Sequence, residues 1–71
     1  MNLPEMPVWR GEDGQIVSCT EKIKVMTENL EELQQLAQDA LEDAILMGCT
    51  EAQVKDYLMV LMQGLTNPYQ K

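Results

Sequence analysis

The sequence predicts a mainly α-helical protein. We expect an antiparallel helical hairpin, with a long first helix and a shorter second one, that follows an N-terminal extended arm or small β-hairpin and dimerises into a four-helix core. Apolar residues recur at spacings of three and four through residues 18–47 and again through 51–63, which is the helical period. The connection between them is short enough to join antiparallel neighbours. The chain should therefore consist of an arm over 1–17, the hairpin over 18–65 and a tail over 66–71.

The arm is expected to be extended, because Pro4 and Pro7 disfavour a helix before them. Two β-prone runs flank the glycine- and aspartate-containing loop 11–14, which predicts a hairpin. A lone two-stranded hairpin is marginal in water, so the arm needs another element to lie on. Trp9 is the expected packing anchor rather than a ligand-stacking residue. The acidic loop lacks the spaced oxygen ligands of a calcium site, and we interpret it as a turn.

The long helix is predicted over residues 18–47. Ser18 and Glu21 have the spacing of a capping box at its start. Gly48 is placed to end it in the left-handed conformation. The apolar residues fit the a and d positions of a heptad that packs along a neighbouring helix, with Cys19 on the same face. This core stripe comprises Ile23, Met26, Leu30, Leu33, Ala37, Ala40, Ala44 and Met47.

The short helix is predicted to begin at Glu51 after an N-cap at Thr50 and to run to about Gln63. Gly64 should end it, with Leu65 folding back onto Val60. Its main stripe is Val54, Leu58, Leu61 and Leu65. Residues 57–62 are apolar on every side, which is typical of a helix buried on more than one side.

Chain length favours a homodimer. A chain of 71 residues buries only about 60% of its unfolded surface and is marginally stable alone. The short helix can cover only the C-terminal half of the long one, and the arm cannot cover both the other half and the outer side of the short helix. The predicted dimer interface is Ile23, Met26, Leu30, Leu33, Ala37, Met59 and Met62.

Charge patterning predicts the orientation of the two chains. Basic residues (Arg10, Lys22, Lys24) gather near the start of the long helix, and acidic residues (Asp39, Glu42, Asp43) gather near its end. Antiparallel long helices would place opposite charges together. A continuous helix would hold Cys19 and Cys49 on the order of 45 Å apart, so a disulfide, which needs Cα atoms within about 7 Å, could join them only between chains.

The acidic balance of the chain limits its partners. Twelve acidic residues against five basic ones give a net charge of −7, which disfavours nucleic acid and anionic membranes. No apolar run is long enough to span a bilayer and no signal peptide is evident, so we expect a cytoplasmic protein with reduced cysteines. A basic protein partner is expected to dock on an acidic face, or that face serves only solubility. The face is Glu28, Glu31, Glu32, Asp39 and Glu42.

Catalytic machinery is missing from the sequence. It has no histidine, no glycine-rich phosphate loop and no nucleophile beside a base, so we expect neither an enzyme nor a cofactor. Asp39, Glu42 and Asp43 have helical spacing for a metal site but lack its histidine, and we interpret them as a solvated face. Ser18 lacks the flanking residues of an acyl carrier.

The predicted function is a non-enzymatic interaction or regulatory protein that acts as a homodimer. One alternative is a chaperone-like holder of a partner helix in a methionine-lined groove. The other is a helical bundle that binds a small molecule or metal. The runs SCTEKIKV, ENLEELQQLAQDALEDAILMGC and LTNPY resemble a short, uncharacterised bacterial family of unknown function. The resemblance covers about residues 8–69 and implies no activity.

Overall fold

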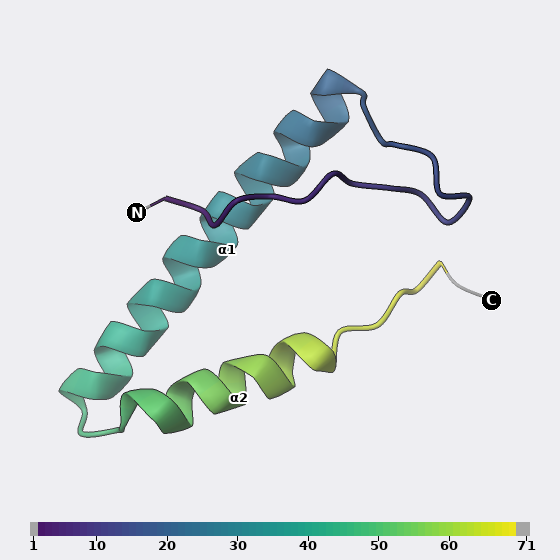
Figure 1. The fold of residues 1–71 in the computed structure, drawn as a ribbon. Coiled ribbons are helices and arrows are strands. Elements are labelled where there is room, and N and C mark those ends of the chain that lie inside the picture. The colour runs from purple at the N-terminus through teal and green to yellow at the C-terminus, as the bar shows by residue number, and fades with distance from the viewer. Residues whose placement is uncertain (1, 70–71) are drawn as a thin grey trace. The chain divides into compact units, whose positions relative to one another are not determined.

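The computed structural model describes residues 2–69. It contains two helices, α1 (Thr20–Leu46) and α2 (Glu51–Gln63), and no strand among those residues (Figure 1). The protein is therefore a mainly α-helical hairpin, as the sequence predicts. The chain divides into two compact units, one up to Leu36 and the other from Ala37 onward. α1 belongs to both, since it is one continuous helix of 27 residues.

The start of α1 differs from the prediction. The helix begins at Thr20, and its first hydrogen bond runs from the Ile23 N–H to the Cys19 carbonyl oxygen at 3.0 Å. Cys19, not Ser18, is thus the N-cap residue. The Cys19 side chain lies close enough to the backbone N–H groups of Lys22 and Glu21 for them to lower the pKa of its thiol.

The end of α1 confirms the glycine stop. Gly48 has a φ of 99°, in the left-handed region. The Cys49 N–H donates to the Ala44 carbonyl oxygen at 2.9 Å, and the Gly48 N–H donates to the Ile45 carbonyl oxygen at 3.0 Å. These two bonds form a Schellman motif, which satisfies carbonyl groups that the last helical turn leaves without partners.

The N-terminal segment forms a closed loop without strands. Arg10 and Ile16 make one isolated antiparallel bridge, and the Val17 N–H donates to the Trp9 carbonyl oxygen at 2.8 Å. Gly14 turns the chain with a φ of 82°. The β-prone runs that flank residues 11–14 therefore meet, but pairing does not extend beyond this single bridge.

Two side chains of α1 hold the arm within the first unit. The Gln34 Nε2 donates to the Asn2 carbonyl oxygen at 3.1 Å. The Thr27 hydroxyl lies 4.0 Å from the Met6 sulfur and also donates to the Ile23 carbonyl oxygen. The arm therefore runs antiparallel to the first half of α1. Its half-buried side chains are three residues apart, at Leu3, Met6 and Trp9.

α2 matches its predicted bounds, and its first turn forms as expected. The Gln53 N–H donates to the Thr50 Oγ1 at 3.3 Å. Lys55 and Glu51, one turn apart, form an exposed ion pair at 3.1 Å. The helix ends at Gln63, but Gly64 stays right-handed with a φ of −79°. Leu65 is 70% exposed, so it gains little cover from the fold-back predicted for it.

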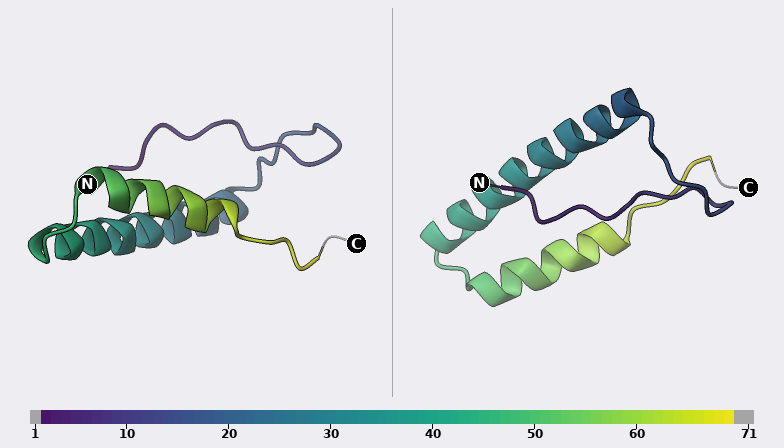
Figure 2. Two further views of the ribbon diagram at one scale, coloured as in Figure 1. Left: turned by 90° about the horizontal axis from the view of Figure 1, so that it is seen from below. Right: turned by 45° about the horizontal axis from the view of Figure 1, so that its top comes forward.

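Within the second unit, α2 turns back beside the last turns of α1 (Figure 2). The least exposed apolar side chains of α2 are Val54, Leu58 and Met62. They are four residues apart, which is the spacing of the ridge that commonly packs between helices. Leu61, which the heptad interpretation placed in this stripe, is 46% exposed. Across residues 2–69 no side chain is fully buried.

Candidate functional site

The covered face of α1 is rotated from the predicted core stripe. Ile23, Leu30, Ala37 and Ala44 are half-buried as the a positions of the heptad, but Leu33 is 44% exposed and Ala40 is also exposed. Thr27, Gln34 and Leu41 are half-buried instead. This is a correction to the predicted stripe. In the first unit the extended arm lies on this side of α1, where the Gln34 Nε2 donates to the Asn2 carbonyl oxygen and the Thr27 hydroxyl lies 4.0 Å from the Met6 sulfur.

The predicted dimer-interface residues fall into two groups. Five of them are half-buried by the chain's own elements: Ile23, Met26, Leu30, Ala37 and Met62. The other two remain available to a partner, since Leu33 is 44% exposed and Met59 is 61% exposed. The predicted set therefore does not form one open surface on the single chain.

The outer surface of α2 is the most apolar exposed part of the second unit. We define it by three side chains, Tyr57, Val60 and Leu61, which are 67%, 60% and 46% exposed and lie within about 100° of one another around the helix. These residues belong to the run that is apolar on every side in the sequence. One ridge of that run faces α1 within the second unit, and the rest has no cover in the described part of the chain.

The acidic face predicted on α1 is exposed throughout, at Glu28, Glu31, Glu32, Asp39 and Glu42. From residue 28 to residue 56 the sequence has eight acidic residues and one basic residue, Lys55. That lysine is already paired with Glu51. This stretch therefore accounts for a charge of −7, equal to that of the whole chain.

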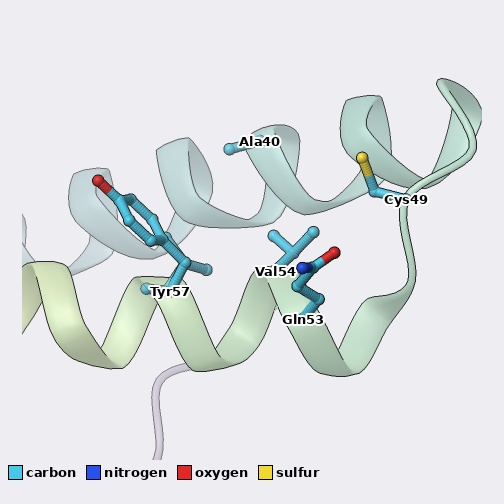
Figure 3. A pocket seen from close by; sticks show the side chains of 6 residues that line it. Ala40, Cys49, Gln53, Val54 and Tyr57 are labelled. Carbon is cyan, nitrogen blue, oxygen red and sulfur yellow. The ribbon is translucent and has the colours of Figure 1, made fainter.

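A shallow pocket of about 380 Å³ lies in the second unit (Figure 3). Figure 3 shows Ala40 on α1, Cys49 in the connection, and Gln53, Val54 and Tyr57 on α2 around it, and Leu58 completes the lining. The walls are mostly hydrocarbon, with one amide, one phenol and one thiol. The chemistry of these walls suits an apolar side chain.

The environment of Cys19 was not predicted from the sequence. It is exposed at the N-terminus of α1, although the heptad placed it on the core face. The backbone N–H groups of Lys22 and Glu21 lower the pKa of the thiol below its ordinary value, with a smaller contribution from the Lys22 charge. A cysteine one residue before a helix is the signal that would have indicated this thiolate-favouring position.

Among residues 2–69, no group of three histidine, cysteine, aspartate or glutamate side chains is arranged to hold a metal ion, and this includes Asp39, Glu42 and Asp43. Neither helix in this part of the chain combines the length and apolar character needed to cross a bilayer.

Comparison with known proteins gives no match to a family model, to a curated protein or to a solved structure. The resemblance to a bacterial family of unknown function therefore remains a prediction.

Proposed function

We propose that this chain is a non-enzymatic interaction protein of the cytoplasm that works as a homodimer and presents the acidic side of α1 to a basic protein. The observation that carries the proposal is the outer surface of α2, where three large side chains on one side of the helix, Tyr57, Val60 and Leu61, are about half or more exposed. Soluble monomers rarely leave apolar groups of this kind together on the surface unless they serve an interaction.

The free energy gained by covering these apolar side chains is comparable to the net stability of a small domain. Full burial of such a side chain is worth about 1.5–3 kcal/mol, so covering the exposed part of these three contributes roughly 3–5 kcal/mol per chain. The net stability of a small domain is about 5–15 kcal/mol. A second chain is thus a strong stabiliser of a unit that has no fully buried side chain of its own among its described residues.

Charge favours α2 over α1 as the self-association surface. α2 carries only Glu51, Lys55 and Asp56, and the first two neutralise each other. α1 carries seven acidic residues against two lysines, so two copies of α1 brought together would repel each other. Self-association through α2 leaves the acidic side of α1 available to a different partner.

Sedimentation equilibrium at micromolar concentration tests this proposal. The wild-type protein should be a dimer, and Val60→Asp should be a monomer, because a charge in the interface would lose its water without gaining a partner. Val8→Asp is the matched control, since Val8 is 63% exposed against 60% for Val60 but lies on the arm. A stable, fully helical wild-type monomer would contradict the proposal.

A further inference from the structure

A second apolar surface lies on α1, beside its covered face. Val25, Leu33 and Leu36 are 54%, 44% and 71% exposed. Together with Asn29 and Ala40 they follow one another at spacings of four, four, three and four residues. Because a helix turns once in about 3.6 residues, these positions stay on one side of it. We call this set the α1 strip: Val25, Asn29, Leu33, Leu36 and Ala40.

The α1 strip has the repeat of a surface that receives another helix. From Asn29 to Ala40 its spacings of four, three and four are those of a coiled-coil seam. The strip spans 15 residue steps of α1, or about 22 Å, which matches roughly four turns of a docked helix. Its last residue, Ala40, has no side chain beyond Cβ, which allows a helix to approach α1 closely there.

An acidic row borders the strip along one edge. It consists of Glu21, Glu28, Glu32, Asp39 and Asp43, all exposed, at spacings of seven, four, seven and four residues. Adjacent helical residues point about 100° apart, so this row lies next to the strip on the side away from the covered face. It is the position that flanking charges occupy beside a coiled-coil seam, where they select the partner.

We infer that the α1 strip binds an amphipathic helix of another protein whose apolar face is flanked by lysine or arginine residues. This inference rests on the proposed function, because it takes the acidic side of α1 as a docking surface, and it adds the form and chemistry of the partner. Charge complementarity selects the occupant. A second copy of the chain would bring another acidic row, whereas a basic helix neutralises the row that is present.

The test uses a synthetic probe of about 21 residues, three heptads long, with leucine at the a and d positions and lysine at the flanking positions. A control peptide carries glutamate in place of every lysine. In calorimetric titration the lysine peptide should bind the wild-type protein and bind more weakly as salt rises, because exposed charges are screened within about 10 Å at 0.1 M. The glutamate peptide should not bind.

Paired variants separate the strip from general charge attraction. Leu36→Glu and Leu46→Glu add the same charge to leucines of α1 that are 71% and 85% exposed, but only Leu36 belongs to the strip. Leu36→Glu should weaken binding about tenfold or more, as for a central interface residue, and Leu46→Glu much less. Glu32→Gln and Glu31→Gln remove the same charge from neighbouring residues. The row residue, Glu32, should matter more, by about threefold.

Each outcome has a distinct meaning. Equal losses for both members of each pair, or no binding of the lysine peptide, overturn the inference while a wild-type dimer leaves the proposed function intact. Dissociation of the dimer by Leu36→Glu, with helicity retained in circular dichroism, overturns the inference in favour of a second copy on the strip. Loss of binding confined to Leu36→Glu and Glu32→Gln, with the dimer intact, supports it.

Discussion

Neither unit of the chain has enough apolar surface to form a core, and the two units cover their helices in different ways. The first unit covers its half of α1 with the extended arm, which is tied down by Gln34 and Thr27. The second unit pairs two helices with well-formed ends but leaves the outer surface of α2 bare. The comparison teaches that an extended arm half-buries one side of a helix, whereas the short second helix of the hairpin keeps large apolar side chains exposed on its outer surface.

The largest expected effect comes from removing the arm. Deletion of residues 1–9 takes away the half-buried Leu3, Met6 and Trp9. At about 1 kcal/mol for each half-buried side chain, the free energy of unfolding should fall by roughly 3 kcal/mol. Urea denaturation followed by circular dichroism, at one fixed protein concentration, measures it. Val8→Ala, at a position 63% exposed, is the control, and an unchanged midpoint after the deletion would mean that the arm does not stabilise the first unit.

The second unit should be weakened selectively at the end of α1. Gly48→Ala puts a Cβ on a residue with a φ of 99°, and the strain should cost about 1–2 kcal/mol. Gly64→Ala is the matched control, because Gly64 is right-handed and a Cβ there meets its nearest atoms at 3.5 Å. That variant should be neutral or more stable by about 0.4–1 kcal/mol. Thermal unfolding of both variants checks the difference, and equal shifts would contradict the assigned conformations.

The smallest expected effect is a pH dependence at Cys19 in the first unit. Folding lowers the pKa of this thiol through the N–H groups of Lys22 and Glu21. Stability from this source is therefore present at pH values above the unfolded pKa and is lost as pH falls through the folded pKa. In a Cys49→Ser variant, the alkylation rate of Cys19 should begin to rise at lower pH in native protein than in urea. Coincident pH profiles would show that the helix end does not act on the thiol.

Local signals in the sequence predicted most of the helical structure. Thr50 and Gln53 located the start of α2, and Gly48 located the end of α1, because capping depends on a few neighbouring residues. The start of α1 was misplaced by one residue because Ser18 and Glu21 have capping-box spacing, whereas the first helical hydrogen bond runs from the Ile23 N–H to the Cys19 carbonyl oxygen. Nothing in residue type alone distinguishes those two possibilities.

Long-range signals were weaker. The apolar period of the sequence predicts that Leu33 and Ala40 face the core. It does not predict that Thr27 and Gln34 are half-buried, because these side chains are polar. In the structure the covered side of α1 includes Thr27 and Gln34, beside which the extended arm lies. Leu33 and Ala40, two residues of the α1 strip, are exposed instead. The surface could therefore not be predicted without knowing where the arm lies.

Sharing α1 between the two units has a consequence for how the chain folds. Starting a helix is costly, while extending one already started adds a hydrogen bond for each residue fixed. A first turn formed in either unit can therefore propagate across the boundary between Leu36 and Ala37 without a second nucleation step. We therefore expect the arm and the hairpin to fold and unfold together. This should hold although the hydrogen bonds of the arm lie within the first unit and those that end and start the hairpin helices lie within the second.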